Sequence, residues 1–142
     1  MNESAKTFAI KLERTVPAPP SQVFDAWLDP TIPGTPFHEN EKLIIDLKVD
    51  GLWYWLFKSQ AHYGRFTEID RPNRIQHSWV SRKTLGEESM VTVAFQKKGE
   101  DTLMTLLHSG LTSGDMAQAH EKGWNFLLDN FAGIFAGGGH GR

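Results

Sequence analysis

The C-terminal segment from Asp115 to Phe135 constrains the fold of this chain more than any other part of the sequence. Six residues recur there at steps of three and four, most of them apolar: Met116, His120, Gly123, Leu127, Phe131 and Ile134. This period is that of one long helix with an apolar face. At a rise of 1.5 Å per residue, such a helix would span about 30 Å, the width of a small domain. Its apolar face must therefore pack against another layer of the protein.

Seven segments that precede this helix have the composition and spacing of β-strands. The first alternates apolar and polar residues, and short breaks with turn-forming residues separate the later ones. The strands are expected at residues 7–16, 42–49, 52–57, 63–69, 74–80, 90–97 and 103–108. Short connections favour antiparallel neighbours, because parallel strands need long crossovers. The pattern predicts an α+β fold, with a curved antiparallel sheet of about seven strands wrapped around the long C-terminal helix.

Six of the seven prolines lie between positions 17 and 36, directly after the first strand. Ser21 is placed to cap a short helix, and Asp29-Pro30 is placed to end it. Residues 31–40 are expected to form a turn or a second, single-turn helix, because prolines and a glycine interrupt them. The sequence thus predicts two short helices after the first strand.

The composition excludes several classes of protein. With 142 residues the chain fits a single domain, expected over residues 1–136, followed by a disordered glycine-rich tail over residues 137–142. The absence of cysteine excludes disulfides, a thiol nucleophile and cysteine-ligated metals. A net charge of -2 without a basic stripe argues against nucleic acid as a partner. No signal segment or membrane span is recognisable, so we expect a cytoplasmic protein without membrane insertion.

Five strings carry a family resemblance, and they lie at residues 14–19, 23–27, 49–53, 64–72 and 123–124. Together with the order of the expected elements, they resemble the START-like (SRPBCC, helix-grip) superfamily, and within it the family related to the activator of the heat-shock-protein-90 ATPase. The resemblance extends from about residue 7 to 135. It implies a helix-grip fold in which the sheet and the last helix enclose an apolar cavity. Chaperone activation in that family usually involves an additional N-terminal domain, so we do not expect it here.

Strand alternation and the resemblance together indicate which side chains face this cavity. Pockets for small molecules are mostly apolar, with a few polar groups that orient the ligand. The predicted ligand-binding residues are Trp53, Trp55, Tyr63, His77, Trp79, Phe95, Met104, His108, His120, Trp124 and Phe131. The aromatic rings would supply contact area, and His77 and His108 would orient the ligand. The predicted function is binding of a small hydrophobic or aromatic molecule, without a cofactor or a metal.

Two other functions remain open at this stage. One is an enzyme of the cyclase, dehydratase or hydrolase kind, in which His77 or His108 would act with Glu68 or Asp70 as acid and base. No nucleophile elbow and no nucleotide-binding glycine pattern supports a particular reaction. The other is a protein-interaction module, for which the apolar residues 52–57 would form an exposed patch or a homodimer interface.

Two further positions carry expectations about the cavity. Gly123 interrupts the long helix, where a glycine costs about 1 kcal/mol relative to alanine. Close contact with a neighbouring element is the expected reason. Relatives often carry a tryptophan pair where this chain has residues 36–39, including Phe37, and the resemblance places that segment near the cavity mouth.

Overall fold

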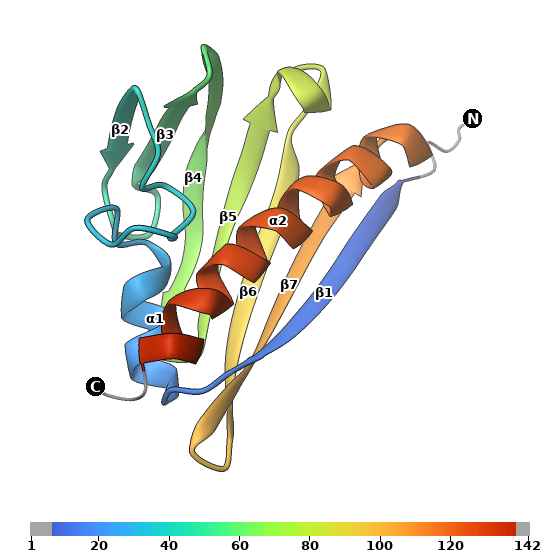
Figure 1. Cartoon of the computed structure of the whole chain (residues 1–142). Coiled ribbons are helices and arrows are strands. Elements are labelled where there is room, and N and C mark those ends of the chain that lie inside the picture. The colour runs from blue at the N-terminus through green and yellow to red at the C-terminus, as the bar shows by residue number, and fades with distance from the viewer. Residues whose placement is uncertain (1–6, 139–142) are drawn as a thin grey trace.

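A computed structural model describes residues 7–138 of the chain, which fold into two main layers (Figure 1). The first layer is a seven-stranded antiparallel sheet with the strand order β1-β7-β6-β5-β4-β3-β2. Its strands are β1 (Phe8–Val16), β2 (Lys42–Ile45), β3 (Leu52–Phe57), β4 (Gln60–Asp70), β5 (Arg74–Ser81), β6 (Ser89–Lys98) and β7 (Asp101–Leu111). The second layer is the helix α2 (Gly114–Gly138), which crosses one face of the sheet obliquely. This arrangement confirms the predicted α+β, helix-grip architecture.

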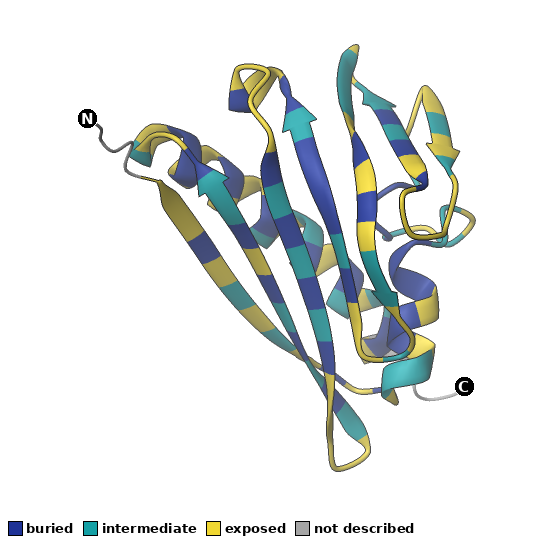
Figure 2. Cartoon of the chain, turned by 180° about the vertical axis from the view of Figure 1, so that it is seen from behind, coloured by how far each residue is buried: buried dark blue, intermediate teal, exposed yellow. Residues whose placement is uncertain are grey.

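Helix α2 packs on the sheet with part of the face that the sequence period predicts, whereas Gly123, which belongs to that period, is exposed. Met116, His120, Trp124 and Phe131 are all buried, and the strands alternate between buried and exposed residues along their length (Figure 2). From β1, the Arg14 guanidinium donates hydrogen bonds to Asp129 Oδ1 at 3.0 Å and to Asn125 Oδ1 at 2.7 Å. Arg14 therefore attaches the edge strand β1 to the side of α2.

The helix is longer than predicted at both ends, because it begins at Gly114 and ends at Gly138. The rest of the predicted tail lies outside the described residues. No helix within residues 7–138 has the length and apolar character needed to cross a membrane.

Between β1 and β2 the structure has only one α-helix, α1 (Pro20–Trp27), and all residues of this segment are described. Pro20 stands in its first turn, where a missing N–H costs little, and no side chain caps this helix, so the expected Ser21 cap is wrong. Residues 31–40 form turns, and the prediction of a second short helix there is wrong as well. The prolines of that segment each lack a backbone donor and restrict φ, which favours turns over a regular helix. A single 3₁₀ turn, η1 (Arg82–Thr84), instead follows β5.

The two hairpins around β3 differ from the expected ones. The strands expected at residues 42–49 and 52–57 would leave a two-residue turn at Asp50-Gly51. In the structure β2 ends at Ile45, opposite Trp53, so a wider loop joins it to β3. A Cβ added to Gly51 would lie 2.0 Å from the Asp46 carbonyl oxygen, which shows how closely this loop folds back on itself. Between β3 and β4 the turn residues Lys58 and Ser59 have φ values of 52° and 64°, as a tight two-residue hairpin requires. β4 therefore begins at Gln60, three residues earlier than predicted.

Candidate ligand-binding pocket

Aromatic side chains fill most of the space between the sheet and α2. Trp53 is fully buried, and its ring centroid lies 5.0 Å from those of both His77 and Trp79. Phe37 stacks on Trp53 at 5.7 Å, so it fills the interior and does not lie at a cavity mouth as expected. Gly64 makes room for this packing, because an added Cβ there would lie 2.7 Å from Trp53 Nε1. This part of the interior is packed core.

A pocket of about 190 Å³ remains beside this core, between the ends of β3, β4 and β5, the turn η1 and the middle of α2. It is lined by Trp55, Phe57, His62, Trp79, Ser81, Lys83, Ala119, His120, Gly123, Trp124, Phe126 and Leu127. An apolar cavity of about 150 Å³ is enough to bind benzene in another protein. The pocket is therefore large enough for one aromatic ring or a group of similar size.

The structure separates the predicted ligand-binding residues into three groups. Four of them line the pocket, namely Trp55, Trp79, His120 and Trp124. Six are buried in the core and do not line the pocket: Trp53, His77, Phe95, Met104, His108 and Phe131. Tyr63 is 43% exposed on the opposite face of the sheet, because neighbouring strand residues point to opposite faces and His62 takes the inward position.

Sequence reasoning missed several pocket residues for identifiable reasons. His62 was placed before the start of its strand, since Lys58 and Ser59 are not typical residues of a two-residue hairpin turn. Lys83 lies in η1, which was taken as a break after β5. Gly123 lines the pocket, and a Cβ added to it would meet nothing within 4 Å. The close contact expected at Gly123 is therefore absent.

His108 connects α2 to the sheet through a chain of hydrogen bonds. Trp124 Nε1 donates to His108 Nδ1 at 3.0 Å, and because an indole only donates, the proton of His108 lies on Nε2. His108 Nε2 then donates to Ser89 Oγ at 2.8 Å, and the Ser89 hydroxyl donates to the Trp79 carbonyl oxygen at 2.8 Å. Burial, together with the nearby His120 and His77, lowers the pKa of His108 to about 3. The neutral form of His108 is thus part of the folded structure.

The pKa values of the half-buried His62 and of the buried His120 and His77 are lowered as well. His62 Nδ1 bonds the Trp55 carbonyl oxygen at 3.3 Å, and His120 Nδ1 bonds the Met116 carbonyl oxygen at 2.8 Å. A carbonyl only accepts, so Nδ1 carries the proton in each ring and Nε2 is left as an acceptor. Burial lowers the pKa of both residues, and the positive charge of Lys83 contributes in the same direction. Burial lowers the pKa of His77 to about 4.

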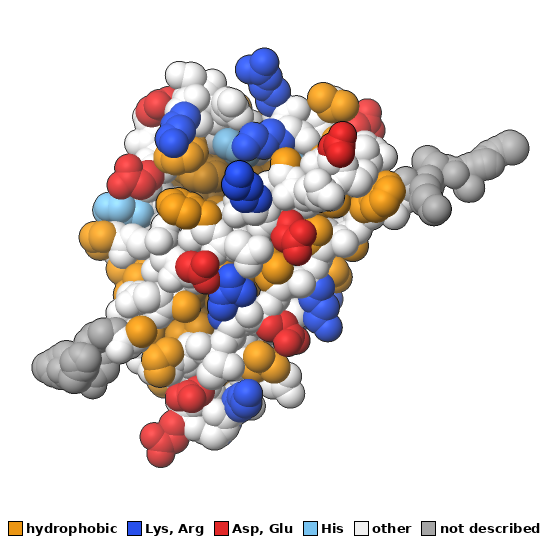
Figure 3. Space-filling model, turned by 45° about the vertical axis from the view of Figure 1, so that its right-hand side comes forward, with side chains coloured by type: hydrophobic (Ala, Val, Ile, Leu, Met, Phe, Trp, Pro, Cys, Tyr) orange, Lys and Arg blue, Asp and Glu red, His pale blue; other side chains and the backbone are white. Residues whose placement is uncertain are grey.

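Two residues that line the pocket, Lys83 and Trp79, carry hydrogen-bond donors without a partner among the described residues. Lys83 is positioned by η1, where its backbone N–H donates to Ser81 Oγ at 3.2 Å. Its ammonium forms no ion pair with any residue that the structure describes. Trp79 Nε1 is buried and has no hydrogen-bond partner within residues 7–138. Basic side chains gather around recessed apolar side chains at one end of the molecule (Figure 3).

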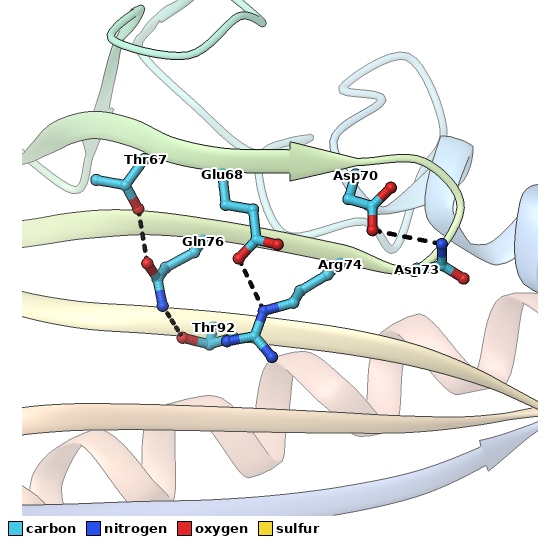
Figure 4. Close-up of polar contacts among 7 residues, drawn as sticks. All are labelled: Thr67, Glu68, Asp70, Asn73, Arg74, Gln76 and Thr92. Carbon is cyan, nitrogen blue, oxygen red and sulfur yellow. Dashed lines mark hydrogen bonds and ion pairs between the residues drawn. The ribbon is translucent and has the colours of Figure 1, made fainter.

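The acidic residues considered for catalysis lie away from the pocket. Glu68 Oε1 accepts a hydrogen bond from Arg74 Nε at 2.9 Å, and Asp70 contacts Asn73 at the β4–β5 turn (Figure 4). A β-bulge between Phe66 and Glu68 shifts the register of β4 at this point. The structure therefore brings neither carboxylate together with His77 or His108. No group of three histidine or acidic side chains suited to a metal occurs in the described part of the chain.

A second hollow, of about 520 Å³, lies between α1 and the C-terminal end of α2. Its lining includes the Pro17–Pro19 segment and two aspartates, and both aspartates already have hydrogen-bond partners. Asp25 binds the Arg71 guanidinium at 2.8 Å, and Asp29 accepts from Thr31 at 2.7 Å. None of the predicted ligand-binding residues lines this hollow. We therefore regard the smaller, aromatic pocket as the candidate site.

Comparison with known proteins agrees with this architecture. The family model described as Activator of Hsp90 ATPase homolog 1-like protein matches residues 17–136. An HSP90 activator from Plasmodium falciparum is 27% identical, with a TM-score of 0.73 over 89% of this chain and 94% of that one. CalU16 from Micromonospora echinospora is 25% identical, with a TM-score of 0.73 over 92% of this chain and 76% of that one. A protein from Staphylococcus aureus shares the fold at 13% identity, with a TM-score of 0.80 over 94% and 96% of the two chains. A search of curated proteins gave no match.

Proposed function

The chain belongs to the family of Activator of Hsp90 ATPase homolog 1-like proteins, and from this premise we propose that it binds a small hydrophobic or aromatic molecule. The observation that carries the proposal is the pocket of about 190 Å³ between the sheet and α2. Trp55, Trp79 and Trp124 form its wall, and aromatic walls of this kind provide most of the contact area in small-molecule sites.

The chemistry of the lining favours binding over acid–base catalysis. Enzymes that use a general acid and a general base need two groups whose pKa values are pushed apart. Here burial lowers the pKa values of both His62 and His120, and the described residues that line the pocket include no carboxylate. The two histidines are therefore suited to accept hydrogen bonds from a ligand.

The alternative of an interaction module receives less support from the structure. It required residues 52–57 to present a continuous apolar face, but Trp53 and Trp55 point inward and are buried. Only the alternate residues of β3 face outward, as in any strand with one covered face. The predicted homodimer and the predicted cytoplasmic location stay predictions.

The proposal can be tested by closing the pocket from α2. Gly123 lines the pocket with open space at its Cβ position, so Gly123→Leu would place a side chain in the pocket mouth without a backbone clash. Gly133 lies on the same helix with equally open space and lines neither of the two hollows described above. Gly133→Leu is therefore a matched control for the change in helix propensity.

The measurement has two parts. Native mass spectrometry followed by denaturing extraction would identify any compound that the purified protein carries. Titration with single-ring aromatic compounds would then be followed by tryptophan fluorescence, because three of the five tryptophans line the pocket. We expect wild type and Gly133→Leu to bind, and Gly123→Leu to bind at least tenfold more weakly. Equal binding by all three proteins, or binding by none, would contradict the proposed function.

A further inference from the structure

The lining of the pocket is unbalanced in charge. Lys83 carries the only full charge among the lining residues, and it forms no ion pair with any described residue. Its charge also reaches the two pocket histidines, because it lowers the pKa values of both His62 and His120. Lys83 is an exposed residue that also lines the pocket, so its charge acts on the pocket from the side that is open to solvent.

Trp79 also lines the pocket, and its Nε1–H has no acceptor in the part of the chain that the structure describes. The Nε1 atom has almost no solvent-accessible surface, so this donor lies behind the pocket wall and not at its surface. The Lys83 ammonium is therefore the group at the pocket that favours a ligand with acceptor atoms and negative charge.

The size of the pocket limits the rest of the ligand. At about 190 Å³ it accommodates a single ring, which would lie among the rings of Trp55, Trp79 and Trp124. The Trp79 and Trp124 rings lie 5.2 Å apart at an angle of 54°, so they form two inclined walls and not a flat stack. Aromatic rings pack well against such edges and faces.

We propose that the occupant is an aromatic carboxylic acid with one ring, which packs against the three tryptophans while its carboxylate pairs with Lys83. This inference rests on the proposed function and adds the chemical class of the ligand to it. A cationic ring would also find aromatic faces here, but Lys83 would repel it. The positive charge of Lys83 therefore selects anions over cations of the same shape.

The test compares three ligands of nearly equal shape: benzoate, benzamide and benzylamine. Each is titrated into the full chain at neutral pH, with tryptophan fluorescence and calorimetry as readouts. Lys83→Met removes the charge and keeps the length of the side chain. Lys98→Met is the matched control, because it makes the same change in net charge at the end of β6 and lines neither hollow.

We expect wild type and Lys98→Met to bind benzoate about fivefold more tightly than benzamide, as an ion pair with an exposed ammonium would allow. In Lys83→Met the affinity for benzoate should fall to that for benzamide, while benzamide binding stays the same. The preference should also shrink in 1 M salt, because screening weakens a pair near the surface.

Three outcomes would overturn the inference. In the first, wild type binds benzoate and benzamide equally; in the second, Lys83→Met weakens both compounds by the same factor; in the third, benzylamine binds best. If a neutral ring binds and Gly123→Leu blocks it, the proposed function stands and only the assignment of an acid fails. If no ring compound binds at millimolar concentration and no extracted ligand is found, the proposed function fails together with this inference.

Discussion

Trp124 Nε1 donates a hydrogen bond to His108 Nδ1 over 3.0 Å, and this bond joins the middle of α2 to β7. The same tryptophan lines the pocket, where its ring lies 5.2 Å from the ring of Trp79. The hydrogen bonds that continue from His108 through Ser89 reach the Trp79 backbone. The network that secures the helix thus also positions two of the three tryptophans in the pocket wall.

Trp124→Phe should destabilise the fold measurably. The change leaves the buried His108 Nδ1 without a donor and removes part of a large ring, so the free energy of unfolding should fall by about 2–4 kcal/mol. Urea denaturation followed by circular dichroism measures this difference. Phe126→Leu is the control on the same helix, because Phe126 is 67% exposed and its replacement should change stability by less than about 0.5 kcal/mol. Equal stabilities of the two variants would show that the bond does not anchor α2.

Stability should decrease in acid because of the buried histidines. In the unfolded chain these residues take up protons near pH 6.5, whereas in the folded protein the pKa is about 4 for His77 and about 3 for His108. Between those values the unfolded state binds more protons, so the free energy of unfolding falls as the pH is lowered from 6.5 toward 4. Above pH 7 these two residues should have no effect on it.

His77→Leu isolates one contribution to this pH dependence. A leucine keeps an apolar side chain among Trp53, Phe66 and Trp79 but cannot be protonated. Urea denaturation at pH 7, 5.5 and 4.5 should therefore show a shallower loss of stability in the variant than in wild type. Histidine NMR titration provides an independent check. A His77 that titrates near pH 6.5 in the folded protein would contradict the structure.

Gly64→Ala should be among the most damaging single changes in the sheet. A Cβ at this position would lie 2.1 Å from the Ser78 carbonyl oxygen and 2.7 Å from Trp53 Nε1. Neither the backbone of Ser78 nor the packed indole can shift without a loss of stability. We expect a loss of more than about 2 kcal/mol in the free energy of unfolding, or failure to fold. A Gly64→Ala protein as stable as wild type would show that the packing around Trp53 is looser than described.

Gly123→Ala should act in the opposite direction. Nothing lies within 4 Å of an added Cβ at Gly123 or at Gly133, and neither residue has a positive φ. Each substitution should therefore stabilise α2 by about 0.5–1 kcal/mol through helix propensity alone. Thermal and urea denaturation of the two single variants and the double variant measure this, and additivity is expected since the sites are far apart along the helix. If Gly123→Ala instead lowered the stability, the close contact predicted from the sequence would be present after all.

The pocket residues show that an error of one residue in the alternation along a strand is enough to misassign a site. Tyr63 was assigned to the interior and His62 was not, although the strand itself was recognised. Consecutive strand residues point to opposite faces, so an error of one residue in parity exchanges the two. The register is set by the β3–β4 turn, where Lys58 and Ser59 adopt positive φ values. The sequence did not predict this turn, because it lacks the asparagine, aspartate and glycine residues that are usual there.

Local patterns in the sequence were sufficient for the long helix and for most strands, and together with the family resemblance they predicted the inward faces of β5, β6 and β7. Those features depend on periodicity, which neighbouring residues along the chain express directly. The position and size of the pocket depend on contacts between residues far apart in sequence. Phe37 stacks on Trp53 and fills one end of the interior, while Gly123 and Lys83 leave the other end open. Side-chain volume and packing decide where space remains, and only the folded arrangement brings those volumes together.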